Sequence, residues 1–172
     1  MELKEVIRNR HSIRSFSEKK PQRKLIDELI SYANLAPSAG NLQARDFIIV
    51  DDATLREQLC IAAFDERFIV EAPFTVVVCA NLERISSYGT RGRELYCIQD
   101  ASAAVEHILL LAVEAGLGAC WVGAFDEQKV STILGLPLYV RPIALIPLGY
   151  AAEQKAPASR MDIAVLTHCN HW

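Results

Sequence analysis

The segment from Glu94 to Ala115 is the longest helical pattern in this chain, and apolar residues cover nearly every side of it. One apolar stripe recurs every three or four residues, and further leucine and valine residues widen it. The stripe consists of Ile98, Ala101, Val105, Ile108, Leu109 and Ala112. A helix that is apolar nearly all round has to be covered by protein on most sides. We therefore expect this helix at the centre of the domain or between two subunits.

Apolar runs elsewhere in the chain predict the strands that accompany this helix. Residues 73–80 form a run without polar alternation, which is typical of a strand that is buried on both faces. Residues 47–50 and 140–148 are similar runs, and 119–122 predicts a further short strand. Four or five strands, interspersed with helices, indicate the α+β class.

The remaining segments complete this outline. The expected helices cover residues 2–9, 21–36, 53–63, 94–115 and 127–134. Segment 82–93 combines serine, glycine and arginine, which predicts an exposed loop. Segment 151–160 predicts an irregular arm, and the alternation of Ile163, Val165 and Cys169 predicts an extended strand.

Length, composition and charge indicate one packed domain. The chain has 172 residues, 51% of them hydrophobic, which is enough for one domain with its own core. No linker or internal repeat divides the sequence, so we expect a single domain over residues 1–172. The formal net charge is −3, which gives no basic surface for nucleic acid.

Cysteine usage and the N-terminal sequence indicate the compartment. The five cysteines are odd in number and none forms a C-x-x-C pair, so neither a disulfide framework nor a zinc site is expected. The sequence begins with charged residues and has no apolar signal core, and its apolar stretches are shorter than the roughly 20 residues that span a bilayer. We expect a cytoplasmic protein without a membrane partner.

A basic cluster follows the first predicted helix. Arg10, His11, Ser12 and Arg14 lie within five residues. Arginine presents a planar fork of donors that suits a phosphate group, and the serine hydroxyl adds another donor. The alternative is a solvated surface cluster, because charged runs usually lie on the surface. Ile13 and Phe16 alternate with the charges, which suggests that one edge of the cluster is anchored to the core.

A second polar segment, Pro37–Gln43, follows the second predicted helix. Asn41 and Gln43 carry both donors and acceptors, so they could bind the edge of a ring with alternating N–H and C=O groups. Ser38 could cap a helix or contact a ligand hydroxyl. The alternative is an ordinary loop that ends a helix.

A third segment, Gly116–Asp126, contains G-x-G, but a helix precedes it and a strand follows, which is the reverse of the dinucleotide-binding fingerprint. Gly123 and Ala124 instead form a small-residue turn after a buried strand. Small residues let a backbone N–H approach a flat ligand closely. The sequence has no metal-ligand spacing, no G-x-S-x-G nucleophile and no Walker lysine loop.

Taken together and in this order, the motifs resemble the nitroreductase family of flavin-dependent oxidoreductases. The resemblance runs nearly end to end, and its strength lies in the collinear spacing. The matching motifs are R-H-S-I-R at 10–14, P-S-A-G-N-L-Q at 37–43, E-A-P at 71–73, R-G-x-x-L-Y-x-x-Q-D at 91–100, G-L-G-A-C-W-V-G-A-F-D at 116–126, P-L-G-Y at 147–150 and H-C-N-H-W at 168–172.

This resemblance implies an α+β, nitroreductase-like fold with a central, mainly antiparallel mixed sheet flanked by helices. It also implies an interlocked homodimer with FMN at the interface, and a C-terminal arm, residues 151–172, that embraces the partner subunit. NADH or NADPH would be the reductant, and a small molecule such as a nitroaromatic or a quinone would be the acceptor in a ping-pong cycle.

The family's flavin-binding residues carry over to matching positions of this chain. Arg10 is the expected phosphate ligand, with Arg160 joining it, and Arg14 is expected at the N1/O2 side of the ring. The full set comprises Arg10, His11, Ser12, Arg14, Gly123, Ala124 and Arg160 from one subunit, and Pro37, Ser38, Ala39, Asn41 and Gln43 from the other. No acid–base side chain is assigned a catalytic role.

The chain departs from the family pattern at two places. Ala158 stands where many relatives carry a lysine, which shifts phosphate binding toward Arg10 and Arg160. Asp65 and Glu66 stand where many relatives carry an amide, and an anion there would disfavour a reduced, negatively charged flavin.

Three other functions remain open at this point. One is a non-catalytic protein that binds or senses flavin. Another is a specialised relative that removes halogen or fragments flavin. The last is a structural dimer module whose loops merely resemble the site.

Overall fold

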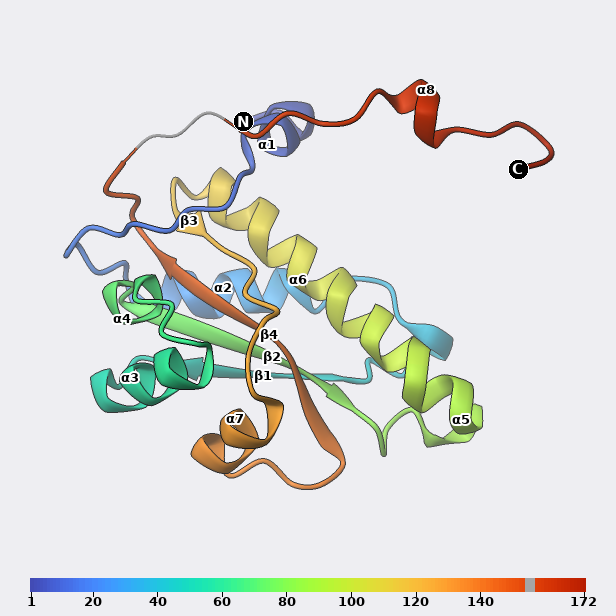
Figure 1. The fold of residues 1–172 in the computed structure, drawn as a ribbon, viewed down its shortest axis with the longest axis horizontal. Coiled ribbons are helices and arrows are strands. Elements are labelled where there is room, and N and C mark those ends of the chain that lie inside the picture. Colours follow the sequence, from blue (N-terminus) through green and yellow to red (C-terminus); the bar gives the residue numbers. More distant parts are fainter. Residues whose placement is uncertain (154–156) are drawn as a thin grey trace.

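A four-stranded antiparallel sheet forms the centre of the computed structural model, which describes residues 1–153 and 157–172 (Figure 1). The strand order is β1-β2-β4-β3, and every pair of neighbours is antiparallel. The strands are β1 (Arg45–Val50), β2 (Phe74–Asn81), β3 (Gly118–Ala119) and β4 (Val140–Gly149). The fold is therefore α+β, as the sequence predicts.

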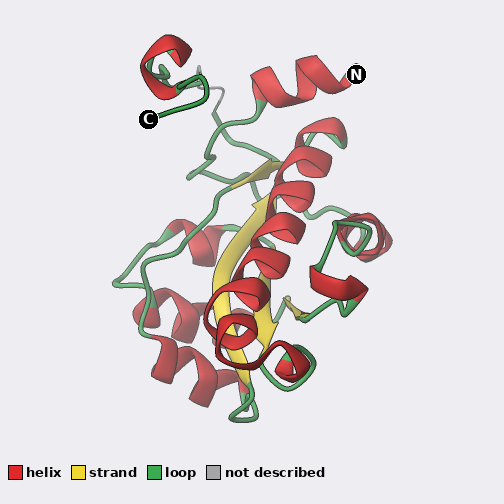
Figure 2. Ribbon diagram, turned by 90° about the vertical axis from the view of Figure 1, so that its right-hand side faces the viewer, coloured by secondary structure: helices red, strands yellow, loops and turns green. Residues whose placement is uncertain are grey.

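The position of β2 in the sheet explains why apolar and polar residues do not alternate in its sequence. All eight of its residues are buried, because helices cover both faces of the sheet (Figure 2). Val76 and Val78 point to one face, and Val77 and Cys79 point to the other, as the two-residue period of a strand requires. The prediction of a strand buried on both faces is confirmed.

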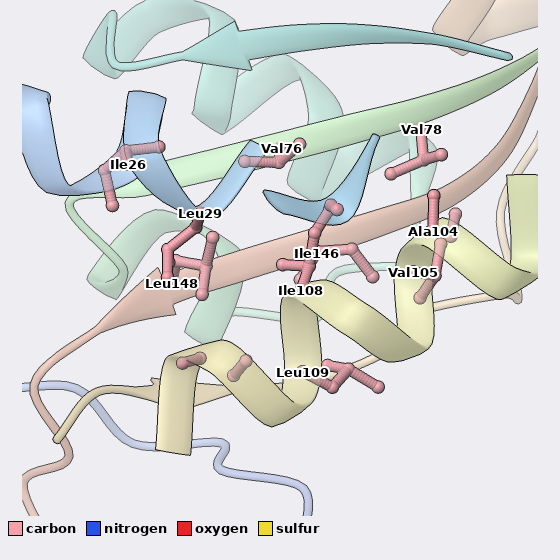
Figure 3. Close-up of a cluster of buried hydrophobic side chains, with 14 of the residues drawn as sticks. Ile26, Leu29, Val76, Val78, Ala104, Val105, Ile108, Leu109, Ile146 and Leu148 are labelled. Atoms are coloured by element: carbon pink, nitrogen blue, oxygen red, sulfur yellow. The ribbon is translucent and has the colours of Figure 1, made fainter. Parts of the chain in front are cut away.

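The long helix α6 (Cys97–Glu114) covers one face together with α2 (Arg23–Ala33). Val105 and Ile108 are fully buried in the same cluster as Val76 and Ile146 of the sheet (Figure 3). Helix α2 adds Ile26 and Leu29 from the side. One side of the apolar helix therefore lies in the core, whereas Leu110, Leu111 and Val113 on its other sides are only partly buried in the single chain.

Three shorter helices cover the other face. Leu59 and Val130 contribute to a second core cluster with Leu145 of the sheet, and both are fully buried. The helices on this face are α3 (Ala53–Ala62), α4 (Phe68–Glu71) and α7 (Glu127–Leu134). Asp52 and Asp126 cap α3 and α7 by accepting backbone N–H bonds from Leu55 and Lys129.

The segment before α6 differs from the exposed loop that its composition suggests. It consists of helical turns that run into α6, and Ile85 and Gly92 are buried there. These turns are η2 (Ser86–Tyr88), α5 (Gly89–Arg91) and η3 (Gly92–Tyr96). The expected exposure holds for most of residues 82–93, but the expected loop is helical. Ile85 is buried in one cluster with Ala80 and Cys97, which local polarity does not reveal.

By length and mean hydropathy alone, the continuous helical segment 86–114 would be long enough to cross a membrane. Such a span was not expected from the sequence. One side of this helix packs on the sheet, where Ala101, Ala104 and Ile108 are fully buried, so the core explains the hydropathy of that side.

The C-terminal arm leaves the body of the domain (Figure 1). Instead of the predicted extended strand, it contains a short helix, α8 (Ile163–Leu166), because the Asp162 carboxylate accepts the Ala164 N–H and caps a helical turn. Residues 157–172 are exposed, including Met161 and Trp172. Of the predicted irregular stretch 151–160, positions 154–156 lie outside the described residues. At the other end, α1 (Leu3–Asn9) precedes the basic cluster.

We expect Ile108→Ala to lower the free energy of unfolding by about 2–5 kcal/mol, because the substitution leaves a cavity between α6 and the sheet. Leu138→Ala is the control, since Leu138 is fully exposed and its loss should change stability by less than about 0.5 kcal/mol. Urea denaturation at one fixed protein concentration measures both. Equal effects of the two variants would contradict the central position of Ile108.

Candidate functional site

The basic cluster lies along the edge of the sheet, next to β3. Ser12 pairs with Ala119 in a parallel bridge, and the Ile13 N–H donates to the Ala119 carbonyl at 2.9 Å. A Cβ atom on Gly118 would lie 2.8 Å from the Ile13 side chain, so the close approach requires glycine at position 118. Ile13 and Phe16 are 8% and 7% exposed. This confirms the expectation that the cluster is anchored to the core.

In the described part of the chain, neither arginine of this edge forms an ion pair or a side-chain hydrogen bond that would stabilise the fold. Arg14 is exposed and Arg10 is half-buried. Among residues 1–153 and 157–172, neither guanidinium takes part in an ion pair or donates a hydrogen bond to another side chain or carbonyl. Guanidinium groups without a protein anion are available for an anionic ligand such as phosphate.

His11 adds an orphaned polar atom to the same edge. Its Nδ1 lies 2.7 Å from the Asn9 carbonyl, which can only accept, so Nδ1 carries a proton. Its Nε2 is buried and has no partner among the residues described. A buried polar atom left unpaired costs about 1–3 kcal/mol, which a ligand would recover. A cavity of about 390 Å³ adjoins His11 and Arg10, and Val113 and Gly116 at the end of α6 line it too.

Cys120 lies behind the basic edge and connects it to the sheet. Its thiol is 2% exposed, and burial raises its pKa. The positive charges of Arg14 and Arg10 and a hydrogen bond with Ser12 oppose the rise in this pKa, whereas the Glu66 carboxylate adds to it. The negative charge of Glu66 and the positive charges of Arg10 and Arg14 thus act in opposite directions on the same thiol. Because the thiol stays protonated near neutral pH, Cys120 acts as a small buried side chain.

The second predicted half of the site, Pro37–Gln43, has an unusual backbone. Gly40, Asn41 and Gln43 have φ angles of 56°, 55° and 50°, which is the left-handed region. Non-glycine residues adopt this region only where the surroundings hold them there. The Gln43 N–H donates to the Ser38 hydroxyl at 3.0 Å, and the Gln43 amide donates to the Asn41 carbonyl at 3.2 Å. Asn41 itself is exposed.

Two buried charged residues hold this loop in place. The Asp100 carboxylate, in the first turn of α6, accepts the N–H groups of Ala39 and Ala44 at 2.9 and 3.4 Å. The Arg45 guanidinium donates to four backbone carbonyls at 2.7 to 3.2 Å. These carbonyls belong to Asn34, Ala36, Pro37 and Asp100. Arg45 and Asp100 are 3% and 4% exposed, and burial lowers the pKa of Arg45 while the Asp100 charge opposes that shift.

The sequence analysis predicts no role for Arg45 or Asp100. Asp100 ends the R-G-x-x-L-Y-x-x-Q-D motif, and Arg45 begins β1, but nothing local relates the two residues. The one available signal was their charge at the ends of apolar segments, because charged residues are rarely buried unless they have partners.

The small-residue turn lies open to solvent. Val122 pairs with Leu145 of β4, and Gly123 and Ala124 follow as exposed residues. A Cβ atom on Gly123 would meet only the Trp121 indole nitrogen, at 3.8 Å. Packing within the chain therefore does not require glycine here, and the backbone is accessible to a ligand.

Arg160 lies on the exposed arm. Its guanidinium donates to the carbonyls of Ala158 and Ser159 at 3.0 and 3.2 Å. Along the described part of the chain it has no further hydrogen bond or ion pair, so its predicted place beside Arg10 stays a prediction.

The structure separates the two halves of the predicted site. Asp100 binds the Pro37–Gln43 loop at the start of α6, whereas the cavity beside Arg10 lies next to Val113 near its end. At about 1.5 Å per residue, these two positions on α6 are about 20 Å apart. Figure 1 shows the basic segment and the loop at opposite ends of α6. One chain alone does not bring them together.

Comparison with known proteins identifies the family to which this fold belongs. A family model for the nitroreductase family matches residues 7–67 and 61–150. The chain belongs to the nitroreductase family. An NADH dehydrogenase of Thermus thermophilus is 30% identical over 191 residues, covering 95% of this chain and 93% of that protein. An FMN reductase (NADPH) of Bacillus subtilis is 26% identical over 182 residues, covering 98% of this chain and 73% of that protein.

A solved structure of a nitroreductase family protein from Clostridium novyi NT is also similar. It superposes with a TM-score of 0.79 at 34% identity, and the match covers 89% of this chain and 87% of that one. The family and fold predicted from the motifs are thus confirmed. The individual ligand contacts of this nitroreductase stay predictions.

We expect Asp100→Ala to destabilise the protein by about 3 kcal/mol, because two backbone N–H groups lose a charged acceptor and the Arg45 charge is left uncompensated. Asp27→Ala is the matched control, since Asp27 forms an exposed ion pair with Arg23 at 2.9 Å and should contribute little. Chemical denaturation measures both variants. Hydrogen exchange should also show faster exchange at the Ala39 and Ala44 amides in Asp100→Ala, and unchanged exchange there would contradict the role of Asp100.

Proposed function

We propose that this nitroreductase is an FMN-dependent enzyme that takes electrons from NADH or NADPH and passes them to an oxidised small molecule such as a quinone or nitroaromatic. The observation that carries the proposal is the edge formed by Arg10, His11 and Arg14. It holds two guanidinium groups without a protein anion and one buried nitrogen without a partner. Relatives named NADH dehydrogenase and FMN reductase support the same reaction class.

The donors of this edge fit a phosphorylated, planar cofactor. Arg10 and His11 border a cavity beside α6, so Arg10 would hold the phosphate. Because Nδ1 of His11 carries the proton, its unpaired Nε2 would accept a hydrogen bond from a hydroxyl or N–H of the cofactor. Ser12 contributes a hydroxyl two residues before Arg14. The open turn at Gly123 and Ala124 follows the segment in which Ala119 pairs with Ser12, and its accessible backbone would contact the same cofactor. Bound FMN supplies the redox chemistry, in which a hydride is accepted from the nicotinamide and electrons pass to the acceptor.

Arg14 and Glu66 would act on the cofactor electrostatically. Arg14 would place a positive charge at the ring edge and so favour the reduced, negatively charged cofactor. The Glu66 carboxylate, whose charge acts on the Cys120 thiol, would oppose the effect of Arg14 if it faces the cofactor. No side chain is assigned to proton transfer.

We further propose that the site is completed by a second copy of the chain. The strained Pro37–Gln43 loop is about 20 Å along α6 from the cavity beside Arg10, so within one chain the loop does not line that cavity. The exposed arm supports dimer formation, because Met161, Ile163, Val165 and Leu166 are 57% to 72% exposed in the single chain. Such a row of apolar side chains is typical of a segment that packs against a partner.

The first test is the cofactor itself. We expect the purified protein to bind FMN and to oxidise NADH or NADPH when a quinone is present. Arg10→Ala should weaken FMN binding about ten- to a hundredfold, which corresponds to a charged hydrogen bond of about 1.5–3 kcal/mol. Arg160→Ala should have a similar effect if the arm reaches the phosphate.

Arg8→Ala is the matched control, because Arg8 is an exposed residue of α1 with the same charge. Flavin fluorescence titration measures the four proteins. A wild-type protein that binds no FMN would refute the proposed function. FMN binding without NADH or NADPH oxidation would identify a flavin-binding protein without this activity.

The second test is complementation between two defective chains. One chain carries Arg10→Ala and the other carries Asn41→Ala, and differently tagged copies are co-expressed and purified as mixed dimers. If each site combines the basic edge of one chain with the loop of the other, a mixed dimer contains one intact site and one doubly altered site. We expect about half of the wild-type FMN content.

Each variant alone, as a homodimer, is the control and should bind FMN weakly. If a site were built within one chain, both sites of the mixed dimer would be defective and its FMN content would stay at the level of the controls. That outcome would refute the shared site.

A further inference from the structure

Three side chains at the start of α6 form a cluster that the proposed cofactor site does not use. The rings of Tyr88 and Tyr96 meet edge to face, with centroids 5.5 Å apart and an interplanar angle of 81°. The Arg91 guanidinium lies 5.5 Å from the centre of the Tyr96 ring, and its Nε donates to the Tyr96 hydroxyl at 3.0 Å. We refer to Tyr88, Arg91 and Tyr96 as the aromatic cluster.

The aromatic cluster borders the Pro37–Gln43 loop. A Cβ atom on Gly40 would lie 2.5 Å from the Tyr88 hydroxyl and 3.2 Å from its ring, so the phenol rests directly on the Gly40 backbone. Gly92 makes room on the other side, because a Cβ atom there would lie 2.7 Å from the Cβ of Tyr88. Two glycines thus hold Tyr88 against the loop in which Asn41 is a predicted flavin contact.

Some polar groups of the aromatic cluster have no partner in the described part of the chain and are available to a ligand. Tyr88 is 44% exposed, and its hydroxyl makes no hydrogen bond with any described residue. Arg91 is exposed, and its two terminal nitrogens have no partner in the part of the chain that the structure describes. An exposed tyrosine face can stack on a planar ring, and an unpaired guanidinium suits a carboxylate or a sulfonate.

We propose that the aromatic cluster is the acceptor-binding wall of this enzyme and that it selects planar aromatic acceptors with an anionic substituent. Tyr88 contacts the ring of the acceptor, and Arg91 binds its carboxylate or sulfonate. Tyr96 holds the Arg91 side chain through the bond at Nε, which leaves the two terminal nitrogens available to the ligand. This inference rests on the proposed function, because it needs the flavin beside the Pro37–Gln43 loop.

The experiment compares two ligands that differ at one substituent, which is an anionic carboxylate in 4-nitrobenzoate and a neutral, one-methyl-larger ester in its methyl ester. Isothermal titration calorimetry measures the Kd of each for the oxidised, FMN-loaded protein without reductant, so that no turnover occurs. We expect Arg91→Ala to raise the Kd of 4-nitrobenzoate about tenfold, as for the loss of one partly desolvated ionic contact. The Kd of the methyl ester should change less than about twofold, since a neutral ester gains little from the charge.

Arg93→Ala is the matched control. Arg93 is two residues away, exposed and equally charged, but its side chain borders a different hollow with Leu82 and Tyr139. This variant should leave the Kd of both ligands unchanged, and Arg91→Lys should retain part of the preference. Tyr88→Ala should weaken both ligands, because it removes the stacking surface.

The possible results distinguish acceptor binding by Arg91 from a general charge effect and from binding of the nucleotide. Equal losses in Arg91→Ala and Arg93→Ala would indicate a general effect of net charge and overturn it, and so would equal losses for both ligands in Arg91→Ala. A KM for NADPH that rises in Arg91→Ala, with the KM for NADH and both Kd values unchanged, would assign Arg91 to the nucleotide phosphate and overturn acceptor selection. Wild-type protein that binds FMN but neither ligand refutes the inference alone, whereas protein that binds no FMN refutes the proposed function first.

Discussion

The packing of α6 on the sheet is the interaction on which the rest of this structure depends. Val105 and Ile108 are fully buried against Val76 and Ile146, and this contact fixes the axis of the helix across the sheet. The two halves of the proposed site are then attached to its ends. Asp100 in the first turn of α6 holds the Pro37–Gln43 loop, and Gly116 beyond the last turn borders the cavity beside Arg10. The helix therefore forms part of the hydrophobic core and also sets the distance between the regions at its two ends.

Structural features that depend on burial alone could be predicted from the sequence. The unbroken apolar run of β2 requires cover on both faces, and the all-round apolar α6 requires a central place, so these two elements fix the layers of the fold. The anchoring of the basic cluster was predictable for the same reason, since Ile13 and Phe16 interrupt its charges.

Features that depend on contacts between distant segments were not predictable. Ile85 lies in a polar stretch, and its burial in one cluster with Ala80 and Cys97 joins residues from different elements. The alternation of Ile163 and Val165 suggests a strand, but no neighbouring strand is present along the described arm, and the Asp162 cap favours a turn of helix. Arg45 and Asp100 are 55 residues apart, so their shared role in holding one loop has no local signature.

The separation of the two half-sites gives the proposed homodimer a physical reason. A rigid helix keeps the basic edge and the strained loop apart, so folding of one chain cannot bring them together. A two-fold axis resolves this, because each chain offers both halves and the symmetric contact pairs each edge with the partner's loop, which yields two complete sites. The same arrangement would carry the aromatic cluster, since Tyr88 rests on Gly40 and moves with the loop. One chain would then bind the cofactor phosphate while its partner selects the acceptor.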